Sequence, residues 1–141
     1  MKLMKKIVVL LSLVALVGCA TLSTVRDAGQ SAGISKEFNS DIELTKSYVL
    51  TSMGRLKINI VKTFENERGF NILFSKDSTG YSDWSTTSSN GEVGRVLIYE
   101  KRGTTIISVH TRTRSIYQIT GTTEQNFADA IFSGLNELSS R

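Results

Sequence analysis

Hydrophobic residues recur at helical intervals in the stretch that follows Ser40. Ser40 and Glu43 have the spacing of a capping box, in which the two side chains satisfy backbone donors of a first helical turn. Gly69 is a suitable stop signal. We therefore predict one long helix from about Ser40 to Glu67, with an apolar stripe made of Ile42, Val49, Met53, Leu56, Ile60 and Phe64.

The same stretch has a second interpretation, in which Gly54 ends the helix. Leu56, Ile58 and Ile60 then alternate with polar residues and form a strand. The long helix is preferred because Phe64 continues its stripe, and the packing of that stripe can offset the cost of about 1 kcal/mol for an interior glycine.

After Gly69 the hydrophobic period changes to two, and turn residues become regular. Asn90-Gly91 is the strongest hairpin signal, because both residues tolerate the positive φ of a type I′ turn. Gly91 and Gly94 are both interpreted as turn glycines. The pattern predicts a four-stranded antiparallel meander, with strands over residues 70–75, 81–87, 95–100 and 104–114.

A second amphipathic helix is expected at the C-terminus, where Thr122 and Gln125 again have capping-box spacing. Two amphipathic helices need an apolar surface, which one face of the meander supplies. We predict an α+β fold for residues 40–141: a two-layer sandwich in the order helix, four strands, helix, with the other sheet face open to solvent. Residues 19–39 are small and polar without a sustained period, and they are expected to form a flexible tether.

The N-terminus has the three parts of an export signal. Lys2, Lys5 and Lys6 precede an apolar run from Ile7 to Val17, which is too short to cross a bilayer as a helix. The run ends at Leu16-Val17-Gly18-Cys19, where a small residue is followed directly by cysteine.

This ending resembles the lipobox of bacterial lipoproteins. The resemblance implies that residues 1–18 are a signal peptide, that Cys19 becomes the acylated N-terminus, and that its acyl chains hold the protein on a membrane. In the Gram-negative members an Asp after the Cys favours the inner membrane. Residue 20 is Ala, which implies the outer membrane, facing the periplasm. The order of elements also resembles small lipoproteins of unknown function, although no functional residue besides Cys19 follows from that likeness.

Composition limits the function further. The 141 residues carry a formal charge of +4, which alone suggests an anionic partner such as nucleic acid. Removing residues 1–18 takes away three of the 17 basic residues and none of the 13 acidic ones, so the mature chain is nearly neutral. We therefore expect no nucleic-acid partner. One Cys and one His also exclude an intrachain disulfide and a structural zinc site.

Few residues are candidates for chemistry or binding. His110, Arg112 and Arg114 share the face of the last predicted strand that is expected to point to solvent. Acids such as Glu100 on a neighbouring strand are expected to neutralise this basic stripe across the sheet, and the alternative is a contact surface for phosphate, lipid headgroups or an acidic partner. Tyr81 and Trp84 are candidate contact aromatics, although a core position is preferred for Trp84 and fits Tyr81 equally well.

No catalytic motif accompanies these residues, and no cofactor or metal site is expected. The sequence predicts a non-enzymatic interaction module with an envelope protein as its partner. The alternative is a small-ligand or lipid-binding lipoprotein with a pocket between helices and sheet.

Overall fold

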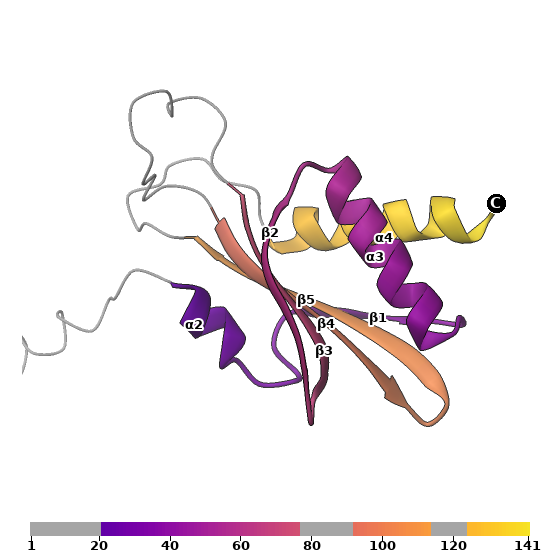
Figure 1. Cartoon of the computed structure of the whole chain (residues 1–141), viewed down its shortest axis with the longest axis horizontal. Coiled ribbons are helices and arrows are strands. Elements are labelled where there is room, and N and C mark those ends of the chain that lie inside the picture. The colour runs from indigo at the N-terminus through magenta and orange to yellow at the C-terminus, as the bar shows by residue number, and fades with distance from the viewer. Residues whose placement is uncertain (1–20, 77–91, 114–123) are drawn as a thin grey trace, which may run out of the picture.

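The computed structural model describes residues 21–76, 92–113 and 124–141, and it confirms the α+β class (Figure 1). Within these ranges five strands form one antiparallel sheet in the order β1-β5-β4-β3-β2, where the sequence predicted four. The elements are α2 (Leu22–Arg26), β1 (Ile34–Phe38), α3 (Ile42–Arg55), β2 (Asn59–Asn66), β3 (Gly69–Lys76), β4 (Glu92–Lys101), β5 (Thr104–Thr113) and α4 (Glu124–Ser139).

Helices α3 and α4 pack on the same face of the sheet, as expected for a helix–sheet sandwich (Figure 1). Val49 and Met53 of α3 and Ile131 and Leu135 of α4 are at most 1% exposed. They meet alternate residues of the central strands, because side chains of period two share a sheet face. The strand residues of this core are Ile72, Phe74, Val96, Ile98, Ile107 and Val109.

The opposite face is not open to solvent as predicted, because the N-terminal segment covers part of it. Val25 of the short helix α2 packs against Leu73 and Val93, with Leu22 and Phe64 at the margin of this second cluster. Val25 has no exposed surface. The sheet is therefore covered by two helices on one face and by α2 on part of the other.

The prediction of a flexible tether over residues 19–39 is wrong for residues 21–39, which belong to the folded domain. Besides α2, this stretch contributes the edge strand β1, which pairs with β5 from Ile34 opposite Val109 to Phe38 opposite Thr105. Gly33 makes the close approach possible: its φ is +91°, and a Cβ there would overlap the Val109 carbonyl. An edge strand needs little alternation of apolar and polar residues, so the hydrophobic pattern of residues 34–38 did not predict β1.

Helix α3 begins one residue later than the capping box suggested. Asp41 is the N-cap, and its carboxylate accepts hydrogen bonds from the backbone N–H groups of Glu43 and Leu44 at 2.9 and 3.2 Å. Ser40 lies just before it, and its hydroxyl accepts a hydrogen bond from the Thr45 hydroxyl at 3.2 Å.

The same helix ends at Arg55, so the prediction of one helix to Glu67 is wrong and the alternative with a break near Gly54 is closer. Lys57 adopts the left-handed conformation with φ of 55°. Its N–H donates to the Gly54 carbonyl and that of Ile58 donates to the Met53 carbonyl, both at 3.1 Å, which is the Schellman pattern of a helix end. The chain then enters β2.

The remaining predicted elements agree with the structure where it describes them. The predicted strand 70–75 lies within β3, 95–100 lies within β4, and most of 104–114 lies within β5. Helix α4 corresponds to the predicted C-terminal helix. The predicted strand over residues 81–87 lies outside the described residues, and β3 pairs directly with β4. Gly94 is not a turn residue, because it lies within β4 opposite Phe74.

Candidate functional site

The predicted contact residues fall into two groups. His110 and Arg112 are in β5, whereas Cys19, Tyr81, Trp84 and Arg114 lie outside the described residues. Arg112 is exposed, as predicted. Its neighbour across the sheet is Val93, whereas Glu100 lies opposite Thr105 at the other end of the hairpin, so Glu100 is not its cross-strand partner.

His110 is not the exposed strand residue that the sequence predicted, because it is only 7% exposed. Its Nδ1 lies 2.9 Å from Oε2 of Glu124, in the first turn of α4. The same carboxylate oxygen accepts a hydrogen bond from the Thr111 N–H at 2.8 Å. Glu124 therefore ties β5 to the start of α4, and His110 is part of that connection.

The most unusual side chain on the α2 face is Arg95, which lies in the middle of β4 and is completely buried. Its neighbours across the sheet are Leu73 and His110. The guanidinium donates hydrogen bonds to three backbone carbonyls at and just after the end of α2: from Nη1 to Ala28 at 2.6 Å and Arg26 at 3.3 Å, and from Nη2 to Gly29 at 2.8 Å.

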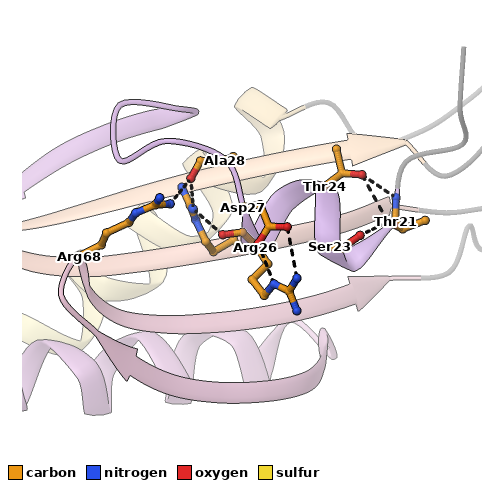
Figure 2. A network of polar contacts seen from close by, with 8 residues as sticks. Thr21, Ser23, Thr24, Arg26, Asp27, Ala28 and Arg68 are labelled. Carbon is orange, nitrogen blue, oxygen red and sulfur yellow. Dashed lines mark hydrogen bonds and ion pairs between the residues drawn. The ribbon is translucent and has the colours of Figure 1, made fainter. Parts of the chain in front are cut away.

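Two further side chains hold the same segment. Arg68, in the turn between β2 and β3, donates from Nη1 to the Ala28 carbonyl at 2.9 Å, as Figure 2 shows. Ser108 of β5 donates to the Ala32 carbonyl at 2.9 Å. We call Arg68, Arg95 and Ser108 the arginine clasp. It binds backbone rather than side chains, so it can hold a segment whose sequence is small and polar.

The electrostatics of the clasp are those of a buried cation among dipoles. Burial lowers the pKa of the Arg95 guanidinium below its ordinary value, and the positive charge of Arg68 lowers it further. A guanidinium remains protonated at neutral pH even so. Nε of Arg95 is buried without a hydrogen-bond partner, whereas the carbonyls satisfy its two terminal nitrogens. The clasp is therefore suited to binding and unsuited to proton transfer.

Sequence reasoning missed Arg95 as a functional residue and treated it as the first residue of a predicted strand. A signal was present, because a single charge interrupts the apolar residues Val93, Val96, Leu97 and Ile98. A buried charge needs several hydrogen-bond partners, and such a pattern predicts a residue that holds another segment in place.

A separate groove of about 390 Å³ runs between β1 and α4. Lys36, Asp129 and Asn136 give it a polar lining, beside the ring of Phe132. It lies at the sheet edge, between a strand and a helix, where the alternative small-ligand function would need a pocket. Further inside, α3, α4 and the central strands meet in the buried apolar core.

Among residues 21–76, 92–113 and 124–141, no three His, Cys, Asp or Glu side chains gather as a metal site would require. In the same ranges no helix is both long and apolar enough to span a membrane. No protein-family model matches the chain. A search of curated proteins also finds no match.

Proposed function

We propose that the protein is a lipid-anchored lipoprotein of the bacterial envelope, whose small α+β domain is a non-enzymatic binding module. The observation that carries the proposal is the run Leu16-Val17-Gly18-Cys19 at the end of a basic and then apolar leader. Because residue 20 is Ala and not Asp, the proposed location is the outer membrane, with the domain in the periplasm.

The anchor supplies a physical mechanism for partner binding. One acyl chain holds a protein weakly and reversibly, whereas two or three bury enough methylenes, at about 0.8 kcal/mol each, for stable attachment. Confinement to a surface raises the effective concentration of the domain toward partners on the same membrane. A membrane-bound envelope protein is therefore the partner that we propose.

Several polar side chains on the α2 face of the sheet make contacts within the domain. His110 contacts Glu124, Ser108 donates to the Ala32 carbonyl, and Arg95 donates to three carbonyls. Each of these groups holds one part of the chain to another. The surface that remains for a partner includes the exposed Arg112 and the groove beside Lys36.

Acylation is tested by growing cells with a clickable fatty acid and comparing the wild type with Cys19→Ala and Cys19→Ser. We expect label on the wild type alone, and an intact mass that corresponds to a chain starting at an acylated Cys19. Since Cys19 is the only cysteine, no other thiol can carry the label. Equal labelling of the three proteins would contradict the proposal.

Location and partner binding need separate measurements. In membrane fractions separated by density, we expect the wild type with the outer membrane and Ala20→Asp shifted toward the inner membrane. In-cell crosslinking is expected to recover a specific partner from the wild type, and this product is expected to disappear in Cys19→Ala. A crosslink that survives loss of the anchor would show that anchoring is not needed for binding.

A further inference from the structure

We propose that the domain lies directly on the bilayer surface, with its α2 end toward the lipid headgroups, and is not held away from the membrane on a flexible tether. This inference rests on the proposed acylation of Cys19. It adds an orientation and an interaction surface, both of which follow from the way the arginine clasp fixes the first folded residues.

The first step is the reach of the chain. Thr21 is the N-cap of α2 and comes two residues after Cys19. Two residues span at most about 7 Å, even when fully extended. A free segment from residue 19 to residue 39 would instead place the domain an average of roughly 25 Å from its anchor. The domain can therefore move only a short distance from an acylated Cys19, provided that α2 stays in place.

The second step is the attachment of α2 to the sheet. Val25 is fully buried against Leu73 and Val93, and Arg95 donates to the carbonyls of Arg26, Ala28 and Gly29. If the segment left the sheet, Arg95 would lose every one of these hydrogen bonds. Departure would also expose the apolar side chains of Val25, Leu73 and Val93 to water, so both hydrogen bonding and apolar burial hold the segment to the sheet.

The third step is direction. Figure 1 shows α2 at one end of the molecule along its longest axis and the C-terminus of α4 at the other. Strand β5 runs from the hairpin turn after Lys101 to Arg112, which lies opposite Val93, a residue of the α2 cluster. The exposed Arg112 is therefore at the α2 end of the sheet.

The charges at this end suit a bilayer surface. Nε of Arg26 lies 2.8 Å from the carboxylate of Asp27, and both side chains are largely exposed (Figure 2). The hydrogen bond from Arg26 lowers the pKa of Asp27, which keeps the pair ionised and neutral overall. Ser23 and Thr24 are exposed and uncharged, so the surface made by α2 and its C-cap Asp27 carries no net charge. Such a surface can approach anionic lipids without repulsion.

The experiment compares the distance from the membrane of two positions at opposite ends of the β4–β5 hairpin. Arg112→Cys and Lys101→Cys place single dye labels on exposed residues about 27 Å apart along the strands, because a strand rises about 3.4 Å per residue. The acylated full-length proteins are reconstituted in phosphatidylethanolamine and phosphatidylglycerol vesicles that carry a headgroup-attached quencher. We expect at least twofold stronger quenching at position 112 than at position 101.

Two variants distinguish the clasp from simple tethering. A 12-residue Gly-Ser insertion between Ala20 and Thr21 leaves the acyl chains and the clasp intact but adds about 20 Å of flexible chain. Arg95→Met removes the buried guanidinium and is used if circular dichroism shows that it folds. We expect the difference between the two labels to shrink in both variants.

The outcomes separate the two proposals. In protein whose acylation is established by mass, equal quenching at the two positions, or an insertion without effect, would overturn the orientation alone. A chain that carries no acyl group and does not sediment with vesicles would overturn the proposed function and, with it, this inference.

Discussion

Arg95 is the residue that most clearly links sequence, packing and function. A buried arginine is usually paired with a carboxylate, but here its hydrogen bonds go to carbonyls at and just after the end of α2. The guanidinium has five N–H donors in a rigid plane, so one side chain can hold several carbonyls that belong to neighbouring residues. Lysine could not reproduce this arrangement, because its charge is concentrated at one atom.

Arg95→Met is expected to lower the free energy of unfolding by about 2 kcal/mol, because the carbonyls of Ala28 and Gly29 lose charge-assisted partners while the cost of burying a cation is removed. Urea denaturation measures the loss. Amide hydrogen exchange is expected to accelerate most at Val25 and its neighbours, because they depend on the clasp.

The matched control is Arg112→Met, the same change at an exposed arginine on the same face of the sheet. It is expected to change the stability by less than about 0.5 kcal/mol. Equal effects of the two substitutions would contradict the clasp.

Gly94 is a second residue whose role depends on a close approach. A Cβ at Gly94 would overlap the ring of Phe74, which is fully buried and also packs on Phe127 with a centroid distance of 5.6 Å. Gly94→Ala is therefore expected to lower the midpoint of thermal unfolding, by an amount that corresponds to about 2 kcal/mol.

Gly54→Ala provides the control for that prediction, because nothing lies within 4 Å of the added methyl group and the residue is helical. It is expected to stabilise the protein by up to about 1 kcal/mol. A Gly94 variant as stable as the Gly54 variant would show that the Phe74 ring moves aside without cost.

At the scale of elements, the end of α3 shows why the sequence predicted a helix that is too long. A helix stop signal is usually a glycine in the left-handed conformation, but Lys57 occupies that position. Met53 and Ile58 are both buried and flank the Schellman hydrogen bonds, so their packing compensates for the backbone strain. Neither feature can be read from the residue type at position 57.

Lys57→Gly is expected to stabilise the protein by about 0.5 to 1 kcal/mol, because glycine adopts positive φ without the steric cost that lysine has. Lys57→Ala is the matched control, since it removes the same side chain and keeps a Cβ. Chemical denaturation of both variants measures the effect. No gain from glycine relative to alanine would mean that Lys57 is not strained.

Strand β2 shows how a strand can resemble a helix. Ile60 packs toward the α3 and α4 face, whereas Phe64 packs toward α2, although residues four apart in a regular strand share a face. The irregular register between Ile60 and Lys62 accounts for the change of face. Their spacing of four therefore matched a helical stripe, and only the pairing with β3 reveals the strand.

At the scale of the whole molecule, the sequence predicted the α+β class, three of the five strands and the helical face of the sheet. These features depend on local periodicity and on the need of amphipathic helices for an apolar partner. The sequence did not reveal the second covered face, because that layer depends on Arg95, Arg68 and Ser108 meeting backbone atoms about 40 to 76 residues away. The single charge of Arg95 within an apolar strand indicates that it holds some segment, but backbone acceptors have no side-chain pattern that identifies which segment it is.

The extent of the domain gives the last prediction. If residues 21–39 were a tether, a chain of residues 40–141 would be as stable as a chain of residues 21–141. Because α2 and β1 belong to the fold, the shorter chain loses Val25, the pairing of β1 with β5 and the carbonyls that satisfy Arg95. We expect its free energy of unfolding to fall by at least about 3 kcal/mol, and its midpoint of thermal unfolding by more than about 10 °C. Calorimetry of the two chains decides between them. Equal midpoints would show that residues 21–39 act as a flexible tether, and the domain would then have no structural reason to stay close to the membrane.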